Sequence, residues 1–267
     1  MENKTSEYLS NFGNVSTLPR KQLLDEMDRV WVQLGLNNKN SLASQPMTVG
    51  EFYSHPVWIL NSLFSDFDSV SKKHRVAIAE QVKKMSASRV ADYGGGGGVL
   101  LARYISEVAA SSVDIIEPYP SSIFVERLSK ISSVKFVSVL DKDYDVVIAQ
   151  DVLEHVDNPL DIAIQQICAT RINGHLIFAN SFYPDIKCHL PSTFYLRHTF
   201  KKLMSYAGLS FVGRVIGAEH ALVFRRIGPI KKDAFDSAVK RAKILGPILN
   251  FIWPVASKCK RIINMMR

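Results

Sequence analysis

Glycines crowd one short stretch of the sequence, and an acidic residue stands just before them. Asp92 is followed by Gly94, Gly96 and Gly98 within RVADYGGGGGVL, where an apolar strand leads through five glycines into the start of a helix. Glycine adopts backbone angles closed to other residues, and its missing Cβ lets the main chain approach a ligand closely. The stretch therefore predicts a turn that holds a nucleotide-like ligand. A flexible linker is the alternative, but linkers are rarely flanked by apolar strand and helix residues.

The same spacing separates two classes of nucleotide site. The dinucleotide fingerprint G-x-G-x-x-G needs a third glycine or alanine where Val99 and Leu100 stand, so the match to an NAD enzyme fails. About 20 residues farther on, the next apolar segment ends in Glu117. A carboxylate at that position can accept both hydroxyls of a ribose. A solvated acid at the end of a strand is the alternative interpretation.

A second group of polar residues belongs to the segment YDVVIAQDVLEHVDNP. Gln150 and Asp151 come directly after its apolar strand. In an open α/β sheet the ligand lies beyond the carboxyl ends of the strands, so both residues should face the same crevice as the glycines. His155 follows in the turn, and His189 lies in a later segment that should overhang the crevice. Either imidazole is a candidate base for an acceptor hydroxyl, with packing in the turn as the alternative for His155.

Other histidines and one cysteine are weaker candidates for this chemistry. His55 lies in the aromatic-rich segment EFYSHPVWILNSLF, and His198 lies on a predicted helix where it can simply pack. Cys188 precedes His189, but neighbours in an extended segment point to opposite faces, which disfavours a nucleophilic pair. Tyr53 is a candidate to roof the ligand from an N-terminal helix, with packing among the helices as the alternative.

Alternating strands and helices from residue 89 onward must position these side chains. Apolar strands are expected at 89–93, 113–117, 134–139, 145–149 and 175–180, and helices near 99–109, 120–130 and 159–171. This βαβ alternation predicts an α/β protein with a Rossmann-like, mostly parallel sheet and helices on both faces. After a helix near 197–207, strands at 209–216 and 221–226 would add a terminal antiparallel pair.

Helical periodicity dominates the chain before residue 89. It predicts one helix from about residue 20 to 34, an aromatic-rich helical region after residue 48, and a helix over 69–85 that leads into the first strand. The predicted organisation is an N-terminal helical cap over 1–74, a ligand-binding domain over 75–228 and a basic amphipathic C-terminal extension over 229–267.

The net charge of +8 is concentrated in the C-terminal tail. Residues 231–267 carry nine Lys and Arg against two Asp, a balance of +7, which leaves +1 for everything before them. A nucleic-acid enzyme would spread basic residues around its cleft, so no nucleic acid is expected as partner. The tail's apolar block, ILGPILNFIWPV, lies between basic clusters and is interrupted by Pro247 and Pro254. It is expected to lie on an anionic membrane surface or to dock on a partner, with packing on the body as the alternative.

Composition limits the remaining classes. The 267 residues are 47% hydrophobic and 22% charged, typical of a globular protein. Neither an apolar run of ~18 residues nor a secretory signal is found, which favours a cytoplasmic location with the tail able to reach the inner membrane surface. Cys168, Cys188 and Cys259 lie far apart without metal-ligand spacing, so reduced thiols and no metal site are expected.

Four motifs occur in a fixed order along the central part of the chain. They are DYGGGGG, DIIEPYP, YDVVIAQDVLEHVDNP and GHLIFAN, within about residues 75–226. In this order and spacing they resemble the motifs of class I S-adenosylmethionine-dependent methyltransferases. The VLEHV stretch is similar to the large branch that acts on small molecules, quinones and glycans.

The resemblance implies a role for each matching residue. The backbone of Gly94–Gly96, with Gly95 as the small residue in second position, would hold the methionine part of S-adenosylmethionine. Asp92 would be linked to it directly or through water. Glu117 would take the ribose hydroxyls, and the main chain at Gln150 would meet the methionine amino group.

The predicted activity is O-methylation of a small molecule, glycan or lipid-linked intermediate, with S-adenosylhomocysteine as product. By the same resemblance, Asp141 or its neighbours would contact adenine, although the segment VLDKDYD is unusually short. Two alternatives come from other classes. One is a non-catalytic partner protein that binds S-adenosylmethionine without turnover, and the other is a nucleotide-sugar or NAD enzyme.

Overall fold

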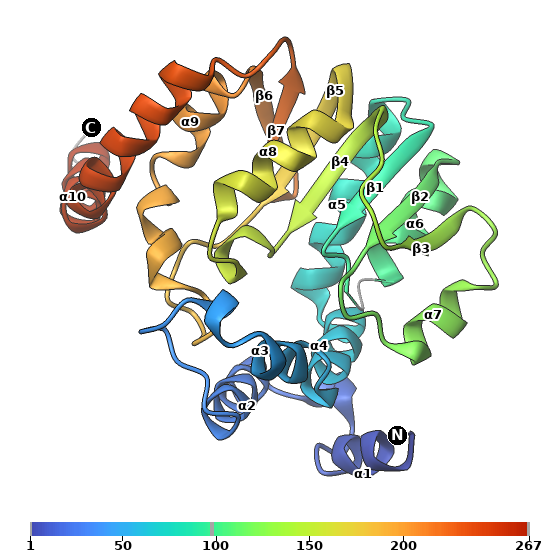
Figure 1. Ribbon diagram of the computed structural model, residues 1–267. Helices are drawn as coiled ribbons and strands as arrows, with labels where there is room; N and C mark the ends of the chain where they lie inside the picture. The colour runs from blue at the N-terminus through green and yellow to red at the C-terminus, as the bar shows by residue number, and fades with distance from the viewer. Residues whose placement is uncertain (1, 97–98, 266–267) are drawn as a thin grey trace.

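The computed structural model describes residues 2–96 and 99–265 and shows a seven-stranded sheet with helices on both faces (Figure 1). The strand order is β3-β2-β1-β4-β5-β7-β6. The first five strands pair in parallel, and β7 runs antiparallel to both β5 and β6. This arrangement confirms the predicted fold class. The strands are β1 (Arg89–Tyr93), β2 (Ser112–Ile116), β3 (Val134–Val137), β4 (Tyr144–Gln150), β5 (Thr170–Ala179), β6 (Leu209–Val215) and β7 (Ala218–Arg226).

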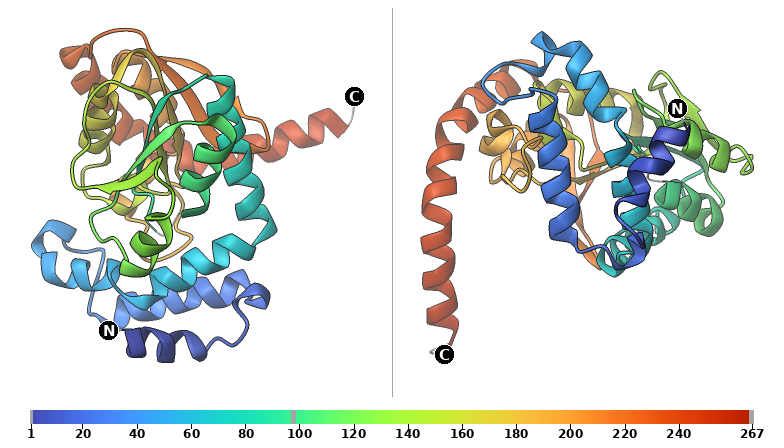
Figure 2. Two further views of the ribbon diagram at one scale, coloured as in Figure 1. Left: turned by 90° about the vertical axis from the view of Figure 1, so that its right-hand side faces the viewer. Right: turned by 90° about the horizontal axis from the view of Figure 1, so that it is seen from below.

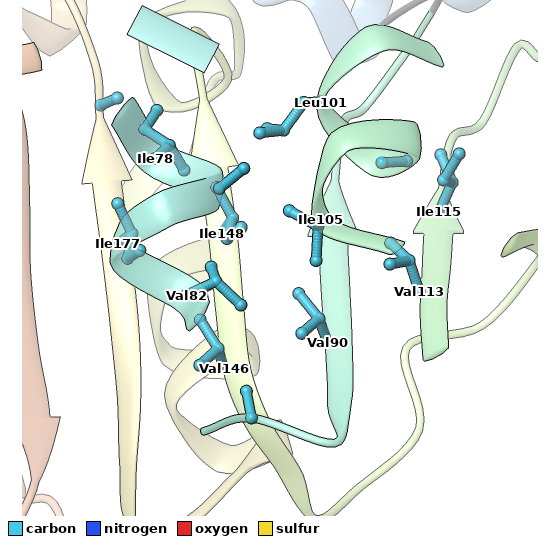
Figure 3. Close-up of a cluster of buried hydrophobic side chains, with 14 of the residues drawn as sticks. Ile78, Val82, Val90, Leu101, Ile105, Val113, Ile115, Val146, Ile148 and Ile177 are labelled. Carbon is cyan, nitrogen blue, oxygen red and sulfur yellow. The ribbon is translucent and has the colours of Figure 1, made fainter. Parts of the chain in front are cut away.

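Side chains of the central strands alternate between two apolar cores. On β4, Val146 and Ile148 face one core, whereas Val147 and Ala149 face the other side of the sheet. Because both faces are covered, these strands are apolar at nearly every position. Figure 3 shows the first core, in which Ile78 and Ile105 close over the strands. The helices packed there are α5 (Ser69–Lys84), α6 (Val99–Ala109) and α7 (Ser122–Leu128), and those on the opposite face are α8 (Pro159–Ala169) and α9 (Phe200–Tyr206).

Strand β5 begins five residues before its predicted start at His175. Tyr144 pairs with Thr170 and Val146 pairs with His175, so the residues between them form an irregular bulge. Asn173 has a φ of 65° within this bulge. The apolar pattern that identifies the strand begins only after the bulge, which explains why the prediction placed the start too late.

Four N-terminal helices lie across the carboxyl ends of the parallel strands (Figures 1 and 2). They enclose a core of their own, into which Leu190 of the sheet domain also packs. Asp157 ties this region to the sheet, because its carboxylate accepts hydrogen bonds from Ser41 Oγ at 2.6 Å and from the N–H groups of Leu42 and Ala43 at 3.1 and 2.9 Å. The helices are α1 (Glu2–Ser10), α2 (Arg20–Gln33), α3 (Pro46–Tyr53) and α4 (Pro56–Phe67).

The C-terminal segment forms one long helix, α10 (Lys232–Met265), which leaves the body of the protein at its far end (Figure 2). The expectation that Pro247 and Pro254 interrupt it is wrong, since the helix runs through both. Contacts with the body support it around Pro247: Asn250 Nδ2 donates to the Phe194 carbonyl at 2.9 Å, and a Cβ at Gly246 would fall 2.4 Å from the Tyr195 carbonyl oxygen. Tertiary packing of this kind outweighs the low helix propensity of proline.

The outer face of α10 is apolar in the middle of the helix, opposite the contacts that Gly246 and Asn250 make with the body. Ile244, Ile248, Phe251 and Ile252 are all exposed, and Phe251 is 84% accessible. Their spacing places them on adjacent turns of the same helix face. Among residues 2–96 and 99–265, no helix has the combination of length and hydropathy that a membrane span requires.

Candidate active site

The glycine turn follows β1 and is shaped by contacts that exclude a side chain. Gly94 has a φ of +71°, and a Cβ there would lie 2.5 Å from Val152 Cγ2. A Cβ on Gly95 would lie 2.8 Å from Asp92 Oδ2. Gly96 has a φ of +51°, in the left-handed region that favours glycine. The turn therefore exposes bare backbone at the end of the strand.

Two carboxyl groups flank this turn. Asp92 is only 2% exposed, and its Oδ2 has no hydrogen-bond partner among residues 2–96 and 99–265. Burial raises the pKa of Asp92 to about 7, against a smaller lowering by the charge of Arg75. Glu117 accepts a hydrogen bond from the Tyr119 N–H at 3.0 Å and another from the Gly96 N–H, while burial raises its pKa. Both carboxyl groups are thus partly desolvated and aimed at the same space.

One cavity of about 1380 Å³ separates the carboxyl ends of the strands from the N-terminal helices. Ligand pockets commonly enclose ~300–1,000 Å³, so this volume has room for a nucleotide-like ligand and a second molecule together. Gly98 lies outside the described residues. All the other residues predicted for the site line the cavity, although their roles stay predictions: Tyr53, Asp92, Gly94, Gly95, Gly96, Glu117, Gln150, Asp151, His155 and His189.

Several buried polar atoms on the cavity wall have no hydrogen-bond partner in the part of the chain that the structure describes. They include Tyr53 Oη, Trp58 Nε1, Gln150 Oε1 and Asn180 Nδ2. Buried polar groups are almost always hydrogen-bonded, so these atoms mark where a polar ligand would be satisfied. They extend from the N-terminal helices to the ends of β4 and β5, which indicates a second ligand subsite beside the glycine turn.

Asn180 was missed by the sequence analysis. Its amide oxygen accepts hydrogen bonds from the N–H groups of Val152 and Leu153 at 3.1 and 2.9 Å, which leaves its NH₂ group toward the cavity. A signal was present, because Asn180 directly follows the fifth strand just as Asp151 directly follows the fourth. The rule that ligands lie beyond the carboxyl ends of strands applies equally to both.

His155 and His189 meet on the cavity wall, with ring centroids 4.8 Å apart. His155 Nδ1 is 3.1 Å from the Cys188 carbonyl oxygen, and His189 Nδ1 is 2.7 Å from the Tyr183 carbonyl oxygen. A carbonyl can only accept, so each Nδ1 carries the proton and donates. Burial, reinforced by His189, lowers the pKa of His155 to about 3, so its ring is neutral and its Nε2 has a free lone pair.

Glu154 lies behind this pair and was also missed. It is fully buried, and one carboxylate oxygen accepts the Ser181 N–H at 2.5 Å while Oε2 has no partner. Burial, with a further contribution from the charge of Asp151, raises the pKa of Glu154 to about 8. In the sequence it is one acid among many, because nothing in VLEHV shows that its side chain turns inward.

The other residues considered from the sequence either lie outside the cavity wall or have a structural role. His55 also lines the cavity, but its Nδ1 accepts the Val57 N–H at 3.1 Å and so caps α4. His198 is not part of the cavity wall. Asp141 is not part of the cavity wall and pairs at 2.8 Å with Arg89, the first residue of β1. Residues 138–143, which follow β3, are not part of the cavity wall.

Comparison with known proteins places this arrangement in a family context. The family model described as "Methyltransferase domain" matches residues 71–212, more than half of the chain. A search of curated proteins finds no matching sequence.

Solved structures with the same fold are distant in sequence. An O-methyltransferase family protein from Burkholderia thailandensis is 16% identical, with a TM-score of 0.50 over 78% of this chain and 70% of that one. Human N-acetylserotonin methyltransferase, solved in complex with S-adenosylmethionine, is 15% identical, with a TM-score of 0.52 over 77% of this chain and 65% of that one. The CurJ carbon methyltransferase is 13% identical, with a TM-score of 0.53 over 85% of this chain and 71% of that one. At these identities the likeness shows the fold.

Replacing Asp92 by Asn should stabilise the ligand-free protein in a pH-dependent way. The pKa of Asp92 rises from 3.8 to about 7 on folding, so above pH 3.8 the folded state holds a proton that the unfolded chain releases. The stability of the wild type therefore falls as the pH rises from about 4 to about 7. We therefore expect Asp92→Asn to have a higher free energy of unfolding than the wild type, by ~1–4 kcal/mol at pH 8 and by much less at pH 4.5. Urea denaturation at the two pH values measures this difference. An equal difference at both pH values would contradict this account.

Proposed function

The chain belongs to the methyltransferase domain family, and we propose that it transfers the methyl group of S-adenosylmethionine to an oxygen atom of a small molecule or glycan. The observation that carries this proposal is the meeting of His155 and His189 on the wall of the cavity that also contains the glycine turn. A hydroxyl needs to lose a proton to become a good nucleophile, and an imidazole Nε2 at this end of the cavity can take it. The lowered pKa of His155 makes it the weaker base, so His189 is the candidate to accept the proton beside it.

The residues of the turn fit the cofactor. S-adenosylmethionine, when bound, supplies a methyl group already activated on a sulfonium. The unpartnered Asp92 Oδ2 is suited to the methionine ammonium, and the bare backbone from Gly94 to Gly96 is suited to close approach by the amino-acid part. Glu117, at the end of β2, is suited to the ribose hydroxyls, and the main chain at Gln150 to the amino group.

The acceptor would occupy the part of the cavity beyond the turn. Trp58 lies edge-on to His155 with 6.2 Å between ring centroids, so the N-terminal helices and the imidazoles face the same space. The unpartnered Tyr53 Oη and Asn180 Nδ2 would orient a hydroxylated molecule there. The α3 and α4 segments cover this space and would exclude water, which suits a reaction that depends on positioning of the acceptor.

Two other functions remain as alternatives. A non-catalytic partner protein would bind S-adenosylmethionine without releasing S-adenosylhomocysteine. A nucleotide-sugar or NAD enzyme would bind those nucleotides in the same crevice. The partnerless Asp92 carboxylate favours the methyltransferase, because a cationic ammonium compensates a buried anion whereas a pyrophosphate repels it.

Replacing Glu117 by Ala should weaken S-adenosylmethionine binding by ~1–3 kcal/mol, because hydrogen bonds to a charged acceptor are lost. Isothermal titration calorimetry measures the change directly. Glu126→Ala, which removes an exposed acid from α7, serves as the matched control and should bind like the wild type. Unchanged affinity in Glu117→Ala would place the ribose elsewhere.

Replacing His155 or His189 by Ala should lower turnover by ~10²–10⁴ with cofactor affinity retained, if proton removal occurs at this end of the cavity. Turnover is measured as S-adenosylhomocysteine released with a panel of hydroxylated acceptors. His198→Ala, outside the cavity wall, is the control and should retain activity. Full activity in both single variants would exclude a role for this pair.

We also propose that α10 binds an anionic membrane surface. Its exposed apolar stripe from Ile244 to Ile252 follows the basic residues Lys240, Arg241 and Lys243, so burial and charge attraction act together. Each Lys or Arg near such a surface contributes ~1 kcal/mol, a term that salt screens.

The full chain should therefore sediment with anionic liposomes, more weakly at high salt, whereas a chain that ends at Pro229 should not. A full-length variant with Ile248→Asp and Phe251→Asp isolates the apolar contribution, because it keeps every basic residue. Equal sedimentation of all three forms, or of none, would reject a membrane role.

A further inference from the structure

Three buried side chains behind the cavity wall bring potential metal ligands together. One ligand atom from each of Glu154, His155 and His189 lies within 4.8 Å of the other two. We propose that this cluster binds a divalent transition-metal ion such as Zn²⁺, coordinated by both imidazole Nε2 atoms and one Glu154 carboxylate oxygen. Sequence spacing predicts no metal site, because the third ligand comes from a separate segment of the chain.

The hydrogen bonds of the two imidazoles prepare them for coordination. Each Nδ1 donates to a backbone carbonyl, from Cys188 for His155 and from Tyr183 for His189, which leaves each Nε2 lone pair free. Metal-bound histidines are typically fixed in this way, with the second ring nitrogen donating to a carbonyl or carboxylate. The two carbonyls therefore orient the rings as an outer shell of a metal site would.

Glu154 provides an independent sign of a missing cation. Its side chain is fully buried, and Oε2 has no donor. A buried carboxylate in such surroundings is costly without a positive partner. A bound divalent ion would supply that partner.

The donor set favours a particular class of ion. Two imidazoles and one carboxylate suit Zn²⁺, Co²⁺ or Fe²⁺, whereas Mg²⁺ and Ca²⁺ prefer oxygen ligands alone. Bonds of ~2.0–2.2 Å require the ligand atoms to be ~3.3–3.6 Å apart in a tetrahedral site. The ligand atoms now lie within 4.8 Å of one another, so forming the bonds requires them to approach by at most ~1.5 Å, a change within reach of small side-chain rotations.

Three protein ligands leave an open coordination position. His155 and His189 line the cavity and Glu154 does not, so the open position would face the cavity. This role rests on the proposed function: an acceptor hydroxyl bound there would release its proton to water, and its oxygen would form the new C–O bond as the C–S bond breaks and returns its electron pair to sulfur. Coordination would then replace direct proton transfer to an imidazole.

Titration of chelator-treated full-length protein with CoCl₂ and ZnCl₂ tests the site. We expect one ion per chain by calorimetry, and a visible Co²⁺ absorption band typical of four or five ligands. Glu154→Gln, His155→Ala and His189→Ala should each weaken Co²⁺ binding by about tenfold or more. The double variant His74→Ala/His220→Ala is the matched control, because it removes another imidazole pair on the same cavity wall, with rings 4.6 Å apart, and should bind Co²⁺ like the wild type.

Binding of S-adenosylhomocysteine to each variant shows whether it remains folded, and only variants that retain it are compared. The metal site would be overturned if the wild type takes up no Co²⁺. It would also be overturned if His189→Ala and Glu154→Gln bind Co²⁺ as tightly as the wild type does. The visible Co²⁺ absorption band of the wild type tests the site even where a variant fails to fold. Co²⁺ uptake without S-adenosylhomocysteine binding would refute the proposed function and leave the metal site standing, whereas the reverse result would refute only the metal site.

Discussion

A buried carboxylate, whose Oδ2 has no hydrogen-bond partner among the described residues, lies at the base of the crevice, and the glycine turn is packed against it. The Asp92 side chain reaches under the glycine turn, where Gly95 leaves room that a Cβ would fill against Asp92 Oδ2 and Ile115. Burying this group in its charged form costs free energy, which a ligand with a positive or hydrogen-bonding group can recover. This unfavourable burial occurs where β1, β2 and β4 end together. Functional sites often contain groups that destabilise the fold in this way.

The far end of the cavity has a different chemistry. There the segment after β5 folds back so that its own carbonyls hold the rings of His155 and His189. The same segment sends its Ser181 N–H to Glu154 and packs Leu190 into the core of the N-terminal helices. One loop thus connects the imidazole pair, the buried acid and the helical cap.

The cofactor end could be located from sequence, but the acceptor end could not. Asp92, Glu117 and Gln150 each end an apolar strand, and the topology of a parallel sheet brings strand ends to one edge. The sequence identifies His155 and His189 as candidate bases. Their contact could not be predicted, because it depends on the path of a loop that has no periodic pattern. The burial of Glu154 depends on the same loop. Likewise, the sequence predicts an interruption at Pro247. The helix is continuous there because Gly246 and Asn250 contact the body of the protein.

A crystal structure of the full chain with S-adenosylhomocysteine tests the central claim most directly. The account predicts that the ribose hydroxyls lie ~2.6–3.2 Å from the Glu117 carboxylate, that the amino group lies near Asp92, and that the sulfur faces the His155 and His189 end of the cavity. Electron density for the ligand at any other surface, or a ligand whose amino group points away from Asp92, would contradict it.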